Sequence, residues 1–299
     1  MIRLGMLDFD TSHVVEFARR LNHKGIEEEQ WVDGATIVVA CAGQSRMMPE
    51  RIPQYQKEIE QIGIPLVPRP EDMIGKVDGM LIESQQGSVH FERARPFLEA
   101  GLACFIDKPF TCSTADAKRL ADLARQKRVP IFSASSLRYA PELVDFIARS
   151  GPERIAGALA YSPGTLHEGN PGLYHYGMHA VEIVYTLMGP GCRRVTCTQE
   201  RDADVVTGQW HDGRVATVRG IRPGRQEYGC IVFTDREARP LPLDTGYIYR
   251  ELLKKIVGMF ETSKAPLDIE VTVEMMAFME AALKSASNHG APEDLGPFN

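Results

Sequence analysis

The chain has 299 residues, of which 43% are hydrophobic, so it is long enough for two domains with sizeable cores. Its formal net charge of -6 at pH 7 provides no basic field for nucleic acid or an anionic membrane surface, and we expect neither partner. No stretch approaches the roughly 20 apolar residues that span a bilayer, and residues 1–7 are too short an apolar run for a signal peptide.

The cysteines are expected to be reduced thiols. They form no CxxC pair, and four of the six lie inside apolar, strand-like runs, which disfavours a disulfide framework and a zinc knuckle. This usage predicts a cytoplasmic protein. The six are Cys41, Cys104, Cys112, Cys192, Cys197 and Cys230.

Residues 1–135 alternate short apolar runs with amphipathic stretches, a pattern typical of a parallel sheet with helices on both faces. The clearest helix is expected over residues 113–127, where Ser113 or Thr114 can cap the first turn. We predict an α/β, Rossmann-like doubly wound domain with right-handed crossovers. Its strands are expected at residues 2–7, 35–42, 64–67, 78–83, 102–107 and 129–133.

The pattern changes after a hinge near residues 134–141. Residues 136–299 are expected to form an α+β domain with an open, mainly antiparallel sheet, in which residues 211–213 (HDG) make a hairpin turn. Helices are expected at residues 141–149, 173–188 and 271–288, the last ending at Gly290. Strands are expected at residues 154–162, 193–199, 203–210, 214–221 and 227–234.

Ligands of an open parallel sheet bind beyond the carboxyl ends of its strands. Candidate residues therefore follow the first, fourth and fifth expected strands: Asp8 to His13, Glu83, Ser84 and His90, and Asp107, Lys108 and Pro109. We expect the chemistry of the chain to lie there.

Lys108 comes directly after an apolar strand and before a proline, which favours an extended backbone and so directs the residue into the crevice. It can anchor a hydroxyl or a cofactor there. If burial or a second cation lowers its pKa from about 10.4, it can also exchange protons. The alternative is a surface lysine at the edge of the sheet.

His175 and His179 lie four residues apart in an expected helix, so both rings can face one way. Three interpretations stay open. They can be ordinary, partly buried histidines, a metal pair that needs a further ligand, or an acid/base group active near neutral pH.

With these residues the chain resembles the Gfo/Idh/MocA family of NAD(P)-dependent oxidoreductases. Residues 99–109, EAGLACFIDKP, are similar to the family segment EAGKHVxxEKP, with Asp107 in place of glutamate. Residues 77–83 and His90 resemble the strand and loop that precede that segment. Residues 172–189 resemble the family helix GxxxDxGxHxxDxxxxxxG, and residues 280–290 resemble its last helix.

The resemblance implies that Lys108 bridges the nicotinamide ribose and the reacting hydroxyl, and that His179 moves the proton. His175 stands where the family usually has aspartate, which departs from the usual proton path. Arg138 and Tyr139 match the family's RY pair and can border the cleft, although packing explains them as well. The resemblance also implies a homo-oligomer, a dimer or tetramer, that buries the open sheet against a partner.

The loop after the first strand departs from the family. A strand of this kind normally runs into GxGxxG, because glycine lets the backbone approach a pyrophosphate at a helix N-terminus. Here Asp8, Asp10 and His13 stand at the three glycine positions. Two carboxylates repel a pyrophosphate, and side chains at these positions obstruct its close approach.

Three explanations for this loop remain open. Thr11 or Ser12 can cap the next helix and donate to phosphate while the acids turn away. The loop can have stopped binding a dinucleotide, leaving a binding or regulatory protein. Asp8, Asp10 and His13 can form a hard-metal site that reaches toward the histidines of the second domain. In the simplest variant Asp10 only caps the helix.

The second strand ends without an acid for the ribose 2′-hydroxyl, and Ser45 and Arg46 can take a 2′-phosphate instead, which favours NADP. An Arg46 on a solvated loop is the alternative. The residues expected to bind NAD or NADP are Asp10, Thr11, Ser12, His13, Ser45, Arg46, Glu83, Ser84, Asp107, Lys108 and Arg138.

The leading hypothesis is an enzyme that transfers hydride between a nicotinamide cofactor and a secondary alcohol of a sugar, cyclitol or related polyol. It assigns no metal ligand. The alternatives are a non-redox binding or regulatory protein on the same fold and a metal-dependent enzyme that uses Asp8, Asp10 and His13. The expected catalytic and substrate-binding residues are Lys108, His175, His179, Tyr161, His167 and Tyr174.

Overall fold

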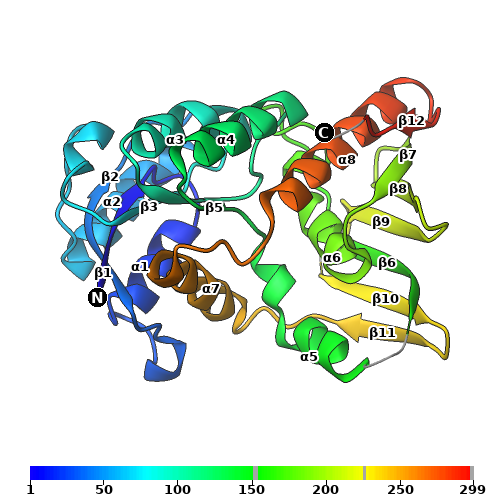
Figure 1. Ribbon diagram of the computed structural model, residues 1–299, viewed down its shortest axis with the longest axis horizontal. Coiled ribbons are helices and arrows are strands. Elements are labelled where there is room, and N and C mark those ends of the chain that lie inside the picture. Colours follow the sequence, from blue (N-terminus) through cyan, green and yellow to red (C-terminus); the bar gives the residue numbers. More distant parts are fainter. Residues whose placement is uncertain (151–153, 225–226, 297–299) are drawn as a thin grey trace. The chain divides into compact units, whose positions relative to one another are not determined.

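The computed structural model describes residues 1–150, 154–224 and 227–296, which form two compact units (Figure 1). The first unit comprises Met1–Thr111, Ala115–Ala134 and Tyr249–Ile269, and the second comprises Cys112–Thr114, Ser135–Ile248 and Glu270–Asn299. This division differs from a single cut at residue 135, because a long segment near the C-terminus returns to the first unit. Among the described residues, none of the helices has the length and apolar character needed to cross a membrane.

The sheet of the first unit has five parallel strands in the order β2-β1-β3-β4-β5, which confirms the expected doubly wound α/β class. The strand expected at residues 64–67 is wrong, because Leu66 forms only an isolated bridge with Ala40. Pro65 and Pro68 beside it have no N–H to extend a ladder. The strands are β1 (Ile2–Leu7), β2 (Ala35–Cys41), β3 (Gly79–Ile82), β4 (Ala103–Ile106) and β5 (Ile131–Phe132).

Helices cover both faces of this sheet: Figure 1 shows α3 and α4 on one side and α1 and α7 on the other. α7 was not expected from the sequence, and it packs closely, since a Cβ on Gly79 would lie 2.3 Å from the ring of Phe260. The α-helices that carry residues of this unit are α1 (His13–Leu21), α2 (Ile52–Ile62), α3 (His90–Glu99), α4 (Thr114–Lys127) and α7 (Ile248–Thr262). Short 3-10 segments lie at η1 (Glu28–Gln30), η2 (Pro49–Arg51), η3 (Pro70–Met73) and η4 (Gly87–Val89).

The second unit contains a seven-stranded sheet in the order β11-β10-β6-β9-β8-β7-β12. Only β6 and β9 pair in parallel among its described strands, so the expected mainly antiparallel sheet is confirmed. The expected turn joins β8 to β9, with Gly213 at φ 88°. The strands are β6 (Ile155–Pro163), β7 (Cys192–Gln199), β8 (Ala203–Trp210), β9 (Val215–Ile221), β10 (Gly229–Thr234), β11 (Ala238–Pro242) and β12 (Glu293–Asp294).

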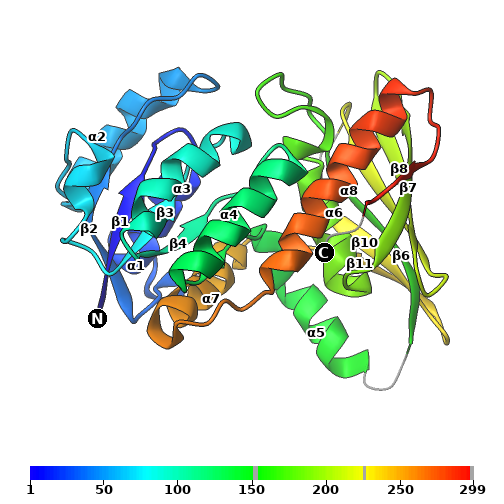
Figure 2. The ribbon, with the colours of Figure 1, turned by 45° about the horizontal axis from the view of Figure 1, so that its top comes forward.

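Helices α6 and α8 lie along one face of this sheet (Figure 2). The helix expected at residues 173–188 starts later, at Met178, and His175 precedes it. Gly177 allows the chain to fold tightly before the helix, because a Cβ there would lie 2.5 Å from Leu173. His175 and His179 therefore do not share a helix face. The helical segments are η5 (Ser136–Tyr139), α5 (Pro141–Ser150), η6 (Gly172–Tyr174), α6 (Met178–Met188) and α8 (Ile269–Ser287).

Candidate functional site

The loop from β1 to α1 keeps a glycine-like backbone without a glycine. Asp8, at the first glycine position of the usual motif, adopts φ 68° in the left-handed region. Aspartate tolerates this region better than most residues because its short side chain bonds locally. The turn at the end of β1 is therefore retained although its chemistry has changed.

The carboxylate of Asp8 is directed into the protein. Oδ2 lies 2.9 Å from Nε of Arg93 and accepts a hydrogen bond from the hydroxyl of Ser84. Oδ1 lies over Gly43, where a Cβ would approach it to 1.7 Å. Burial raises the pKa of Asp8 to about 6, even though Arg93 and Ser84 favour the ionised form.

Asp10 ties the loop to the end of β3. Its Oδ1 accepts the backbone N–H of Gln85 at 2.8 Å, and its carbonyl accepts a hydrogen bond from Arg51 at 3.1 Å. Arg51 also donates to the side-chain oxygen of Gln85 at 3.0 Å. The carboxylate thus bonds outside α1, so the interpretation of Asp10 as a helix cap is wrong.

The hydroxyl residues at the start of α1 differ from each other. Oγ1 of the buried Thr11 accepts the N–H of His13 at 3.4 Å. Ser12 is the N-cap residue by position, but its side chain makes no capping hydrogen bond and is exposed. Ser12 is therefore a surface residue at the positive end of α1, where its side chain hydrogen-bonds with the hydroxyl of Tyr249.

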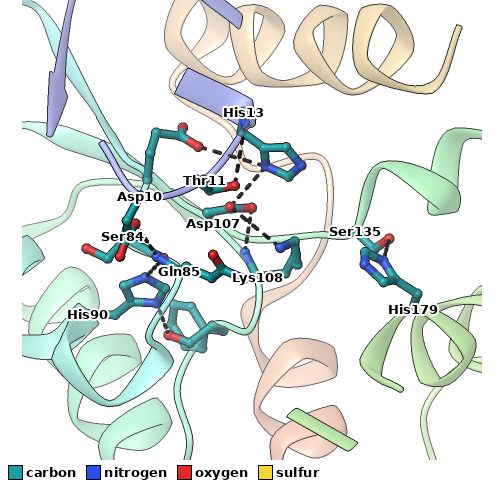
Figure 3. Close-up of polar contacts among 12 residues, drawn as sticks. Asp10, Thr11, His13, Ser84, Gln85, His90, Asp107, Lys108, Ser135 and His179 are labelled. Carbon is teal, nitrogen blue, oxygen red and sulfur yellow. Dashed lines mark hydrogen bonds and ion pairs between the residues drawn. The ribbon is translucent and has the colours of Figure 1, made fainter. Parts of the chain in front are cut away.

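His13, Glu83 and Asp107 meet where α1 begins and β3 and β4 end (His13 and Asp107 are shown in Figure 3). Nδ1 of His13 lies 2.9 Å from Oδ2 of Asp107 and 3.9 Å from Oε2 of Glu83. The ring of His13 is held between Phe17 and Tyr249, with centroids 5.1 and 5.0 Å away. The group of Asp8, Asp10 and His13 suggested as a metal site is wrong, because both aspartates bond elsewhere.

The pKa values of the two carboxyl groups of this cluster shift in opposite directions, although both groups are buried. Burial and the charge of Asp107 raise the pKa of Glu83 well above its ordinary value. Burial alone would also raise the pKa of Asp107, but the neighbouring His13 and Lys108 lower it to about 2. Asp107 is therefore the ionised carboxylate, and Glu83 favours the neutral form.

Lys108 is held at the end of β4, with only 10% of its side chain exposed. Its backbone N–H donates to Oδ1 of Asp107 at 2.7 Å, and its Nζ lies 3.9 Å from Oδ2 of the same residue. The bond to Pro109 is cis. The ring of His90 joins the segments after β3 and β4, with its nitrogens 2.7 Å from the carbonyl oxygen of Ser84 and 3.0 Å from that of Phe110.

Two cavities of about 380 and 510 Å³ lie at the ends of β2 and β3, and both are lined by Gln44 and Arg93. The smaller cavity brings together four of the expected cofactor residues: Asp10, Ser45, Arg46 and Ser84. Nη2 of Arg93 donates to the carbonyl of Gln44 at 3.1 Å. The sequence did not single out Arg93, because its importance comes from Asp8, which lies 85 positions earlier.

In the second unit, the ring of His179 is oriented by a hydroxyl: its Nδ1 lies 2.7 Å from Oγ of Ser135. Glu182, one helical turn later, accepts the N–H of Ser135 at 3.2 Å and forms a buried ion pair with Arg138. Arg138, which was expected to bind the cofactor, therefore pairs with a carboxylate of its own unit. Neither Ser135 nor Glu182 was singled out from the sequence. The only signal for Glu182 was the family helix pattern of residues 172–189, which has an acid at this position.

The other expected substrate residues have different environments. The rings of His167 and His175 lie 5.4 Å apart, and the ring of His175 lies 4.8 Å from that of Tyr176. Tyr161 is partly exposed on β6. Tyr174 is a core residue, fully buried with its hydroxyl donating to the carbonyl of Met276 at 2.8 Å, so its assignment to a substrate cleft is wrong.

Known proteins resemble this chain in part of its sequence and in nearly all of its fold. Residues 44–135 match the family model for the oxidoreductase family with the NAD-binding Rossmann fold, GFO_IDH_MocA. Over 127 residues the chain is 27% identical to "Putative oxidoreductase YceM" of Salmonella typhimurium, a match that spans 42% of this chain and 41% of that protein.

Solved structures share the fold at low identity. The myo-inositol 2-dehydrogenase of Lactobacillus plantarum has a TM-score of 0.82, 14% identity and 99% coverage of both chains. From Lactobacillus casei, the scyllo-inositol dehydrogenase with NAD(H) and scyllo-inositol has a TM-score of 0.81, 11% identity and 99% coverage of both chains. The myo-inositol dehydrogenase of the same organism, with NAD(H) and myo-inositol, has a TM-score of 0.80 and 13% identity. The match covers 99% of this chain and 97% of that chain. The family model therefore covers residues 44–135, and the solved structures show that the whole chain shares the fold of these dehydrogenases.

Proposed function

We propose that the chain is an NAD(P)-dependent oxidoreductase acting on a secondary alcohol of a sugar, cyclitol or related polyol. The observation that carries this proposal is the buried Lys108 at the end of β4, paired with Asp107 inside the region that matches the family model. The bound polyols and NAD(H) of the two Lactobacillus casei dehydrogenases support the substrate and cofactor classes.

The residues of the first unit are compatible with a dinucleotide despite the lost glycines. Both acids of the β1–α1 loop are buried and bond to protein groups through one carboxylate oxygen, which reduces their repulsion of a phosphate. Ser12 at the N-terminus of α1, Arg93 and Arg46 are the groups that would hold phosphates. The adjoining cavities at the ends of β2 and β3 would receive the adenosine half, and Ser45 and Arg46 favour NADP.

Lys108 and His179 are assigned the acid and base roles. A nicotinamide cofactor supplies the hydride acceptor or donor when it is bound. Lys108 binds and orients the reacting hydroxyl, because Asp107 holds its backbone and lies near its ammonium group. His179 accepts the hydroxyl proton, and Ser135 orients its ring through Nδ1. The substrate contacts are assigned to Tyr161, His167 and His175.

The enzyme assay uses a panel of polyols with NAD and NADP, followed by the absorbance of the reduced nicotinamide. We expect Lys108→Ala to lower kcat/KM by about 100-fold or more, while the exposed Lys127→Ala on α4 leaves it unchanged. The dissociation constant of the cofactor should change much less than kcat. Equal activity of Lys108→Ala and Lys127→Ala would overturn the proposal.

A second candidate is a non-redox binding or regulatory protein on the same fold. The replacement of all three glycine positions by Asp8, Asp10 and His13 is the observation that favours it. This candidate predicts binding of a small molecule without turnover of any polyol, and Lys108→Ala would then change affinity alone.

We also propose a cytoplasmic homo-oligomer, a dimer or tetramer. All six cysteines are free, which suits a reducing compartment. Val215 and Phe233 are exposed on the second sheet, with exposed fractions of 47% and 41%, and a second copy would cover them. Sedimentation at micromolar concentration should give a multiple of 33.3 kDa, and the mass of a single chain would contradict this assembly.

A further inference from the structure

The cluster of His13, Glu83 and Asp107 has the composition of a metal site. One imidazole and two carboxylates come from three different elements, and one ligand atom of each lies within 4.8 Å of the other two. All three residues are buried, with Glu83 and Asp107 completely excluded from solvent. The cluster lies wholly within the first unit, so it does not depend on the second unit.

Glu83 provides an independent indication that a ligand belongs here. Neither of its carboxyl oxygens has a hydrogen-bond partner, although the side chain is fully buried. A buried polar group without a partner destabilises the folded state, and a charged one does so more strongly. Native proteins rarely retain such a group unless an ion or a water binds it.

The contact between His13 and Asp107 also indicates a missing ligand. Nδ1 and Oδ2 lie only 2.9 Å apart, although the ring N–H is poorly aligned with the oxygen. Two ligands of one ion approach each other in this way when their lone pairs point to a common third position. Metal–ligand distances of about 2.0–2.2 Å place neighbouring ligand atoms roughly 3–3.5 Å apart, close to the observed 2.9 and 3.9 Å.

We propose that His13 Nδ1, Glu83 and Asp107 bind one divalent transition-metal ion of the Zn²⁺ or Mn²⁺ class. Mixed imidazole and carboxylate ligands suit these ions, and two carboxylates balance the charge of a divalent cation. The rings of Phe17 and Tyr249 keep His13 in its ligating orientation. The ion would join the N-terminus of α1 to the ends of β3 and β4. This inference does not rest on the proposed enzymatic function.

The test starts with purified, chelator-treated protein of the full chain, to which Zn²⁺ or Mn²⁺ is added before unbound ions are removed. We expect one equivalent by elemental analysis and a rise in Tm with metal concentration. Glu83→Gln, which keeps the size of the side chain, should weaken binding by about 10- to 100-fold or more. Asp8→Asn and Asp10→Asn are the matched controls and should retain one equivalent.

Co²⁺ provides a second readout that needs no variant. The wild-type protein should show the strong visible absorption of four- or five-coordinate Co²⁺, so the proposal stays testable even if Glu83→Gln fails to fold. Less than a tenth of an equivalent with no rise in Tm, unchanged binding in a folded Glu83→Gln, or only the weak absorption of six-coordinate Co²⁺ would each overturn the proposed site.

Discussion

The ends of β1 and β4 belong to the same sheet but have diverged to very different degrees from the family pattern. At the end of β4, residues 106–109 keep the acid, lysine and proline in order, and Lys108 is buried beside Asp107. At the end of β1, acids and a histidine replace all three glycines, yet Asp8 keeps a left-handed backbone. A loop can therefore keep its shape while its electrostatics change, provided that distant groups such as Arg93 bind the new side chains.

The largest effect expected at the β1 loop is a pH dependence caused by Asp8. Its pKa rises from 3.8 to about 6 on folding, so the native state keeps this proton between about pH 4 and 6 while the unfolded state loses it. Stability should therefore fall as pH rises through this window, by on the order of 3 kcal/mol from this group.

Urea unfolding of the wild type and Asp8→Asn at a series of pH values measures this effect. The free energy of unfolding of Asp8→Asn, relative to that of the wild type, should increase between pH 4 and 7, because asparagine does not titrate. Asp235→Asn is the control, since Asp235 is exposed in the turn between β10 and β11 and the variant should run parallel to the wild type. Parallel curves for Asp8→Asn would show that Asp8 is not desolvated.

Removing the partner of Asp8 should have the next largest effect. Arg93→Ala leaves a buried carboxylate without its cation, and because Arg93 is itself 29% exposed we expect a loss of about 1–3 kcal/mol in the free energy of unfolding. The double variant Arg93→Ala/Asp8→Asn should recover most of this loss. Arg95→Ala, on the same helix, is the control.

The same variants sharpen the contrast with β4. Arg93→Ala should weaken cofactor binding by about tenfold or more, because a charge-assisted contact to phosphate is lost. Lys108→Ala should instead lower kcat. If Arg93→Ala changed kcat alone, Arg93 would not be a cofactor-binding residue.

The smallest expected effect concerns the choice between the two nicotinamide cofactors. Arg46 is exposed at the mouth of the smaller cavity, so screening limits its attraction for a 2′-phosphate. We expect Arg46→Ala to reduce a preference for NADP by about three- to tenfold, with NAD affinity unchanged. Comparison of both dissociation constants for wild type and variant measures this, and a parallel change for both cofactors would contradict a role for Arg46 in this choice.

Much of the fold could be predicted from local patterns, and the site only in part. The apolar strand before Lys108 and the proline after it were enough to place this residue at a strand end. The bonds of the Asp8 and Asp10 carboxylates could not be predicted, because their partners lie 75 or more positions away. Likewise, α7 packs against the first unit after an insertion of more than a hundred residues, and no local pattern reports such a return.

The cluster of His13, Glu83 and Asp107 shows most clearly which part of the site could not be predicted from the sequence. Asp8, Asp10 and His13 are neighbours in sequence, but the loop directs both aspartates away from the histidine. Glu83 and Asp107 replace them because parallel strands bring their carboxyl ends to one edge of the sheet. Adjacency across strands, which a single sequence does not display, therefore determines which acids meet His13.

Calorimetric titration of the wild-type protein with NAD and with NADP tests most directly whether the altered β1 loop still serves a dinucleotide. We expect saturable binding of one cofactor per chain in the micromolar range, tighter for NADP than for NAD. No binding of either cofactor at millimolar concentration would contradict it and would leave the non-redox interpretation of the fold.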